Sequence, residues 1–166
     1  MNYEMILMKE ENLEECAAVI RQGFSTVAKD FGLTIENCPT NGAFIQKERL
    51  LEERKKGQMM YGMVTDQKII GFMQLEKNTD ELYFLQKLVV LPEYRHFGLG
   101  TKLLDYAREK VKELGGKRLS ISIIEENTIL KNWYMQYGFV PTGTRKFEHL
   151  PFTVGFLVLN AVDAEN

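Results

Sequence analysis

The chain has 166 residues, of which 45% are hydrophobic and 27% are charged, a composition typical of an ordinary soluble globular protein. This length predicts a single domain, residues 1–166, with a sizeable core. The 21 basic and 23 acidic residues give a formal net charge of −2 without a long run of one sign. We therefore expect neither a nucleic acid nor a membrane as partner, and no apolar segment approaches the roughly 20 residues of a spanning helix.

The start of the chain lacks the basic residues and the long apolar core of a signal peptide. Two cysteines, Cys16 and Cys38, are too few for a disulfide framework. We read both as thiols and expect a cytoplasmic protein. The histidines His96 and His149 are far apart in the sequence, so no metal site is predicted.

The predicted elements follow from apolar periodicity and from the residues that end helices and strands. Asn12, with Glu15 three positions later, has the pattern of a capping box at the start of the first helix. Helical spacing predicts four helices, over residues 13–31, 43–56, 99–114 and 128–137. Short apolar or alternating runs predict seven strands, over residues 3–8, 59–65, 68–75, 82–91, 118–124, 139–144 and 152–159.

The lengths of the connections predict how the strands pair. Short turns join the three strands between residues 59 and 91, which favours antiparallel neighbours. A helix separates strand 82–91 from strand 118–124, so these two should run parallel through a right-handed crossover. The fold class predicted is α+β: a mixed, mostly antiparallel sheet of about seven strands flanked by four helices.

The stretch from residue 88 to 104, LVVLPEYRHFGLGTKLL, carries the clearest functional signal. Its apolar strand should end at Pro92, and a loop with Arg95, Gly98 and Gly100 then leads into an amphipathic helix. Backbone N–H groups exposed at a helix N-terminus beside an arginine are suited to binding an anion. The alternative is that the two glycines only ease a turn between a strand and a helix.

Two segments together resemble the GCN5-related N-acetyltransferase (GNAT) superfamily: EYRHFGLG after the LVV strand, and NTILKNWYMQYGF further on. The resemblance extends from residue 1 to about residue 160 and is strongest from 85 to 140. It implies the acyl-CoA N-acyltransferase fold, an enzyme of the acyltransferase class, and acetyl-CoA as co-substrate without a metal.

The resemblance also implies a set of cofactor-binding residues. The loop would cradle the pyrophosphate of acetyl-CoA with Arg95, His96, Phe97, Gly98, Leu99, Gly100 and Thr101. The strand residues Leu88, Val89 and Val90 would follow the pantetheine arm and polarise the thioester carbonyl. Asn127 matches the family asparagine that hydrogen-bonds cofactor or substrate. His96 and Phe97 depart from the family pattern, in which glycine and a basic residue are usual.

The implied chemistry is direct attack of an amine on the thioester, without a covalent enzyme intermediate. Tyr134 matches the family tyrosine that protonates the leaving thiolate, although its pattern also fits a core tyrosine. The candidate general bases are glutamates at strand ends, namely Glu76, Glu81, Glu125 and Glu126. Glu126 is the first choice because it adjoins Asn127.

The sequence leaves the acceptor unspecified beyond a small-molecule or peptide amine. By family analogy the first two helices and their loop, with Phe24, Phe31, Thr34 and Cys38, should form one wall of the acceptor site. A homodimer is possible, since dimers are common in the family. An alternative function is an acyl-CoA-binding module without catalysis, which the unusual His96–Phe97 pair and the lack of an obvious base would suit.

Overall fold

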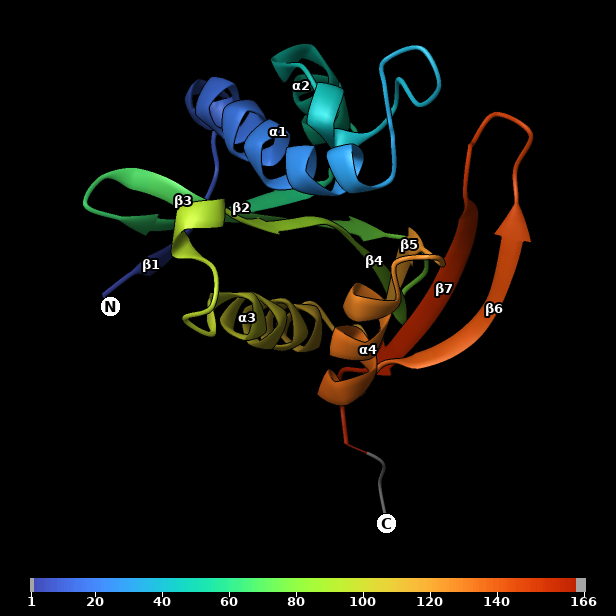
Figure 1. The fold of residues 1–166 in the computed structure, drawn as a ribbon. Helices are drawn as coiled ribbons and strands as arrows, with labels where there is room; N and C mark the ends of the chain where they lie inside the picture. The colour runs from blue at the N-terminus through green and yellow to red at the C-terminus, as the bar shows by residue number, and fades with distance from the viewer. Residues whose placement is uncertain (1, 164–166) are drawn as a thin grey trace.

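The computed structural model describes residues 2–163, and these form a seven-stranded sheet between two pairs of helices (Figure 1). The strands are β1 Glu4–Leu7, β2 Met59–Thr65, β3 Lys68–Lys77, β4 Leu82–Val90, β5 Arg118–Ile124, β6 Val140–Lys146 and β7 Thr153–Asn160. The helices are α1 Leu13–Asp30, α2 Lys47–Lys55, α3 Leu99–Glu113 and α4 Thr128–Tyr137. Single 3₁₀ turns span Glu10–Asn12, Gly42–Phe44 and Pro92–Tyr94.

The sheet has the strand order β1-β2-β3-β4-β5-β7-β6. All neighbours are antiparallel except β4 and β5, which run parallel on either side of the α3 crossover. Helices α1 and α2 cover one face of the sheet, and α3 and α4 cover the other (Figure 1). The predicted fold class, a mixed and mostly antiparallel sheet of seven strands with four helices, is confirmed.

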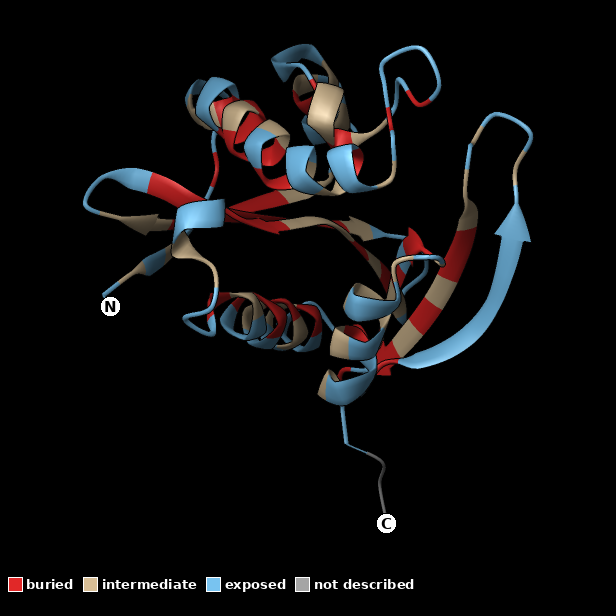
Figure 2. Ribbon diagram, viewed as in Figure 1, coloured by how far each residue is buried: buried red, intermediate tan, exposed pale blue. Residues whose placement is uncertain are grey.

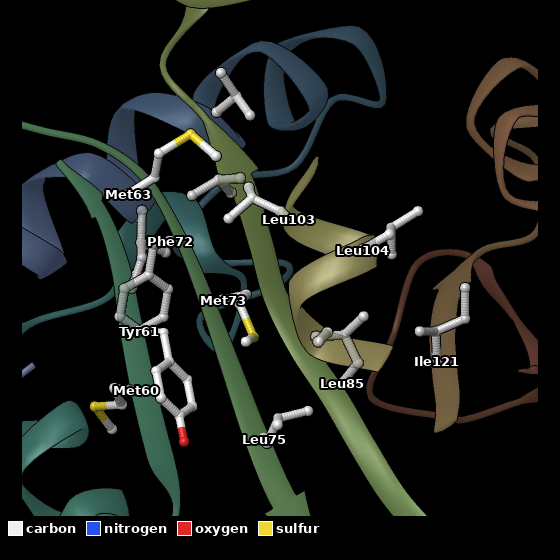
Figure 3. Close-up of a cluster of buried hydrophobic side chains, with 14 of the residues drawn as sticks. Met60, Tyr61, Met63, Phe72, Met73, Leu75, Leu85, Leu103, Leu104 and Ile121 are labelled. Carbon is white, nitrogen blue, oxygen red and sulfur yellow. The ribbon is translucent and has the colours of Figure 1, made fainter. Parts of the chain in front are cut away.

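The main core lies between the first five strands and α1 and α3. Helices α1 and α3 each have one buried and one exposed face. Strand β3 is buried along most of its length, because both faces of the sheet are covered there (Figure 2). Figure 3 shows how side chains from neighbouring strands and from α3 interdigitate in this core. The buried cluster there includes Met60, Met63, Phe72, Met73, Leu75, Leu85, Leu103, Leu104 and Ile121.

Three local predictions were wrong. Helix α2 begins at Lys47 rather than at residue 43, because Gly42–Phe44 forms a 3₁₀ turn and Ile45 and Gln46 are extended. The capping box does not form at α1, since the Asn12 side chain instead accepts the backbone N–H of Lys9 at 2.8 Å. The last two strands start about one residue later than predicted and extend further.

Two irregularities of β4 position the site. One extra residue on β4 shifts its register with β3 between Gln86 and Val89, and Lys87 adopts φ 52° at this bulge. On its other side, β4 pairs with β5 only from Leu82 to Phe84. Beyond Phe84 the two parallel strands diverge, whereas the opposite edge of β5 stays paired with β7 along its length.

Candidate active site

A cavity of about 1100 Å³ opens where β4 and β5 diverge. Its walls come from all four helices and from both strands. The lining includes residues 84–90 of β4 and 120–124 of β5, with Phe24, Val27, Arg49, Asn127, Trp133, Tyr134 and Phe152 around them. The structure thus places residues that are up to 133 positions apart in the sequence, Gly23 and Phe156, around one space.

The end of β4 presents unpaired backbone to this cavity. Leu88, Val89 and Val90 line it, and none of them pairs with β5. A strand edge with free N–H and C=O groups can add an extended chain by ordinary ladder hydrogen bonds. The three β4 residues selected from the sequence therefore lie beside a slot that suits an extended ligand.

The loop before α3 has the geometry of an anion-binding concavity. His96 has φ 68° and Gly98 has φ 76°, so the backbone turns through the left-handed region twice in three residues. Gly98 is the N-cap of α3 and makes no side-chain capping bond, which leaves the first-turn N–H groups of this 15-residue helix open. Such a loop followed by an uncapped helix N-terminus favours a phosphate group.

Gly100 has a separate role at the same helix end. A Cβ on Gly100 would lie 3.1 Å from Cζ2 of Trp133 in α4, which is closer than nine in ten real Cβ contacts. The missing side chain therefore lets α4 approach the α3 N-terminus. His96, Gly98, Leu99, Gly100 and Thr101 all line the cavity.

Arg95 and Phe97 do not lie as the motif implies. The Arg95 guanidinium donates to the carbonyls of Val90 at 3.1 Å and Gly23 at 2.8 Å, and to the Thr26 hydroxyl at 3.1 Å. Arg95 thus ties the end of β4 to α1, although it also lines the cavity. Phe97 is 65% exposed and is not among the residues that line the cavity.

Asn127 and Tyr134 both reach the cavity from the region of α4. The Asn127 carboxamide oxygen accepts the N–H of Leu130 at 3.2 Å, so this residue is the N-cap of α4, as its sequence pattern allowed. Tyr134 is buried, and its ring meets Trp133 and Phe139 edge-on at 4.9 and 5.3 Å. Burial raises the pKa of the Tyr134 phenol, so at neutral pH the hydroxyl is protonated and able to donate.

The four glutamates selected as possible bases lie outside the cavity lining, and each has a partner. Glu126 accepts the N–H of Thr153 at 2.8 Å and borders a neighbouring cavity of about 360 Å³. Glu125 pairs with Lys131, and Glu76 accepts from Gln86. Glu81 lies at the far end of β4, where it pairs with Lys117 at 3.3 Å and Arg118 at 3.6 Å.

A polar cluster that sequence analysis missed lies on the α2 side of the cavity. The Lys87 ammonium donates to Glu53 at 2.7 Å, and Arg49, one turn earlier in α2, donates to the same carboxylate at 3.4 Å. Burial alone would raise the pKa of Glu53, but the hydrogen bonds from Lys87 and Gln74 and the charges of Lys87 and Arg49 together outweigh it and lower that pKa. Burial lowers the pKa of Lys87 against the opposing effect of Glu53. Arg49 and Lys87 line the cavity.

The expected acceptor wall is present in part. Phe24 and Cys38 line the cavity, together with Val27 of α1. Phe31 and Thr34 are not among the lining residues. Burial raises the pKa of Cys38, which therefore contributes a neutral thiol to the wall.

Residues 2–163 contain neither a membrane-spanning helix nor a cluster of metal ligands. No helix in that range is long and apolar enough to cross a membrane. Within the same part of the chain, no three His, Cys, Asp or Glu side chains gather in a way that could hold a metal ion.

Sequence comparison finds one family and several relatives. The family model described as "Acetyltransferase (GNAT) family" matches residues 29–139. An uncharacterized N-acetyltransferase from the pepI 3′ region of Lactobacillus delbrueckii subsp. lactis is 25% identical, over 92% of this chain and 90% of the relative. An uncharacterized N-acetyltransferase of Schizosaccharomyces pombe, C663.13c, is 31% identical over 50% of this chain and 59% of the relative.

Solved structures share the fold at lower identity. The PaiA N-acetyltransferase of Thermoplasma acidophilum, crystallised with coenzyme A, has a TM-score of 0.79 and 23% identity, over 96% of this chain and 99% of that one. The ribosomal-protein-S18-alanine N-acetyltransferase of Escherichia coli has a TM-score of 0.78 and 13% identity, over 99% and 97% of the two chains. At these identities the likeness extends to the fold alone.

Proposed function

The chain belongs to the acetyltransferase (GNAT) family, and we propose that it transfers an acetyl group from acetyl-CoA to a primary amine. The observation that carries this proposal is the cavity between the diverging ends of β4 and β5, which meets the uncapped N-terminus of α3. A thioester with an extended arm and a pyrophosphate needs those two features together.

The residues on the α3 side fit coenzyme A. The N–H groups of the first turn of α3, with the turns at His96 and Gly98, would hold the pyrophosphate. The backbone of Leu88 and the N–H of Val90, whose carbonyl accepts from Arg95, would pair with the amide groups of the pantetheine arm. A neighbour with the same fold was crystallised with coenzyme A, which supports this proposal.

The reaction we propose is direct acyl transfer. The acetyl thioester supplies an electrophilic carbonyl carbon; the amine nitrogen bonds to it, and the carbon–sulfur bond breaks to release a thiolate. A backbone N–H of β4 would stabilise the oxyanion that develops on the carbonyl oxygen. Burial keeps the Tyr134 phenol neutral, so Tyr134 would donate its proton to the thiolate, and the proton lost by the amine would return to the phenolate through water.

Proton loss from the amine is the step with the least support from side chains. The lining residues drawn from positions 2–163 include no Asp or Glu. Glu126 as general base stays a prediction; with its carboxylate bonded to the Thr153 N–H, it would act through water. Glu126→Gln tests this role. If Glu126 is the base, the variant should have a lower kcat than the parent protein and a different dependence of kcat on pH.

Calorimetric titration with acetyl-CoA, followed by an amine panel read by thiol release, tests the proposal. We expect binding below millimolar concentration and release of coenzyme A with at least one primary amine. Absence of binding at millimolar acetyl-CoA would refute the proposal. Binding without thiol release from any amine would favour the alternative of an acyl-CoA-binding module, which would suit a cavity lining that has no carboxylate among the described residues.

A further inference from the structure

The charges that line the large cavity are all of one sign. Among the residues described, the lining contains the cations Arg49, Lys87 and Arg95, together with His96, and no carboxylate. A cavity that received a polycationic acceptor would need carboxylates, since cations repel one another where water is partly excluded. The lining therefore disfavours amines that carry further positive charges.

The cations fall into two groups held by different elements. Arg95 and His96 belong to the loop that precedes α3, and the Arg95 guanidinium is already bonded to the Val90 carbonyl and to α1. Arg49 lies in α2, and Lys87 reaches the same side because its ammonium contacts Glu53 of α2. Since α2 and α3 cover opposite faces (Figure 1), Arg49 and Lys87 belong to the half of the cavity that faces the acceptor.

Arg49 and Lys87 keep donors that the protein does not use. Of the five N–H groups on Arg49, one donates to Glu53 and one to the Thr40 carbonyl at 2.7 Å. The Lys87 ammonium donates to Glu53 and to the Gln86 carboxamide at 3.2 Å. Within the described chain no further partner is present for either cation, so at least three N–H groups of Arg49 and one of Lys87 are open.

One carboxylate is bonded to both cations. Glu53 pairs with Arg49 and Lys87, whereas Glu76 accepts from Gln86 and acts on Lys87 through its charge alone; neither carboxylate lines the cavity. The side chain of Lys87 is only 7% exposed, which weakens screening by water. A planar oxyanion could accept from the open guanidinium fork and from the ammonium together.

We propose that the acceptor carries an oxyanion, a carboxylate or a phosphate, in addition to its primary amine, and that Arg49 and Lys87 bind this group. The neighbouring wall of Phe24, Val27 and Phe152 is apolar, so the acceptor class is an amino acid-like molecule with an apolar side chain. This inference rests on the proposed acetyl transfer, because it concerns the molecule that supplies the amine.

The first experiment compares acceptors that differ only in the anion. Leucine and phenylalanine, their amides, and the matching aminophosphonates are assayed by release of coenzyme A, with spermidine as a polycation. We expect kcat/KM to be at least tenfold higher for the acids or for the phosphonates than for the amides, and the better of these two sets identifies the anion. Equal rates for acids and amides, or a preference for spermidine, would overturn the anion site while leaving acetyl transfer intact.

The second experiment locates the anion site with variants of α2. Arg49→Gln should raise the KM of the anionic acceptor about tenfold or more and leave the KM of acetyl-CoA unchanged. Arg49→Lys should restore part of the loss, and Arg54→Gln, an exposed position of the same helix, is the matched control. An increase confined to the KM of acetyl-CoA would instead assign Arg49 to the coenzyme and refute the proposal.

A binding measurement covers the case in which no amine in the panel turns over. N-acetyl-leucine and N-acetyl-leucinamide are titrated into the protein loaded with coenzyme A. Binding of the acid at least tenfold tighter than the amide, with the difference lost in Arg49→Gln, supports the anion site without any catalysis. Equal binding of the two refutes it, whereas failure of acetyl-CoA itself to bind refutes the proposed function.

Discussion

Replacing Arg95 tests whether this residue of the glycine loop acts mainly by holding the fold together. The Arg95 guanidinium bonds two partly buried carbonyls, those of Val90 and Gly23, and the exposed hydroxyl of Thr26. Arg95→Met keeps much of the apolar stem and removes all three bonds. It therefore separates the link between β4 and α1 from the packing of the side chain.

The expected magnitude follows from the two carbonyl bonds. A hydrogen bond to a charged group contributes roughly 1.5–3 kcal/mol, and the exposed hydroxyl adds little. Because both carbonyls are only partly buried, water replaces part of each bond, and we expect a net loss of about 3 kcal/mol. For a domain of this size each kcal/mol lowers the melting temperature by about 2–4 °C, so the fall should be roughly 6–12 °C.

Urea unfolding and differential scanning calorimetry measure the loss, with Lys102→Met as the control. Lys102 is an exposed cation in the first turn of α3, so its removal changes the charge near the loop without breaking the link to α1. An unfolding midpoint for Arg95→Met within error of the parent protein would refute the structural role. A loss of acetyl-CoA affinity with unchanged stability would assign Arg95 to the phosphates instead.

Three further predictions concern catalysis, cofactor binding and alkaline stability. Tyr134→Phe should leave the dissociation constant of acetyl-CoA unchanged and lower kcat at least tenfold. Because burial raises the pKa of this phenol, its ionisation should not reduce the rate of the parent protein between pH 8 and 10. An unchanged kcat in the variant would remove the tyrosine from the mechanism. Gly100→Leu should weaken acetyl-CoA binding at least tenfold in calorimetry, because its side chain meets Trp133 beside the open N–H groups; unaltered affinity would show that the ligand does not approach this turn. Burial raises the pKa of Cys16 from 9.0 to about 12, so the folded state keeps a proton that the unfolded state releases, and the free energy of unfolding should fall between pH 9 and 12. Cys16→Ala should reduce that slope by up to about 1.4 kcal/mol per pH unit in urea titrations, and an identical slope would contradict the assignment.

The sequence predicted the elements well where local periodicity decides the structure. All seven strands and four helices were found, because each has one clear apolar face or a continuous apolar run. The errors fell where tertiary contacts compete with local preference. Residues 43–46 have no feature that forbids a helix, yet Asn41 caps a single 3₁₀ turn at Gly42–Phe44 and the chain then extends.

The candidate site was predictable only as far as its motifs extend. The glycine loop, Asn127 and Tyr134 carry recognisable spacing, and the structure brings them to one cavity. The cluster on α2 has no such spacing, since Glu53 and Lys87 are 34 positions apart and meet only when α2 packs on the sheet. The acceptors of the Arg95 side chain in α1 lie about 70 residues earlier for the same reason.

The bulge at Lys87 connects the two halves of the cavity. A positive φ costs a residue other than glycine roughly 1 kcal/mol or more, so something must hold Lys87 in this conformation. Its ammonium bonds Glu53 at 2.7 Å in a nearly buried position, an interaction strong enough to offset that cost. The extra residue also turns the following β4 backbone out of register with β3 just where β4 leaves β5. One ion pair between β4 and α2 therefore supports both the cation proposed to bind the acceptor and the strand edge proposed to hold the thioester.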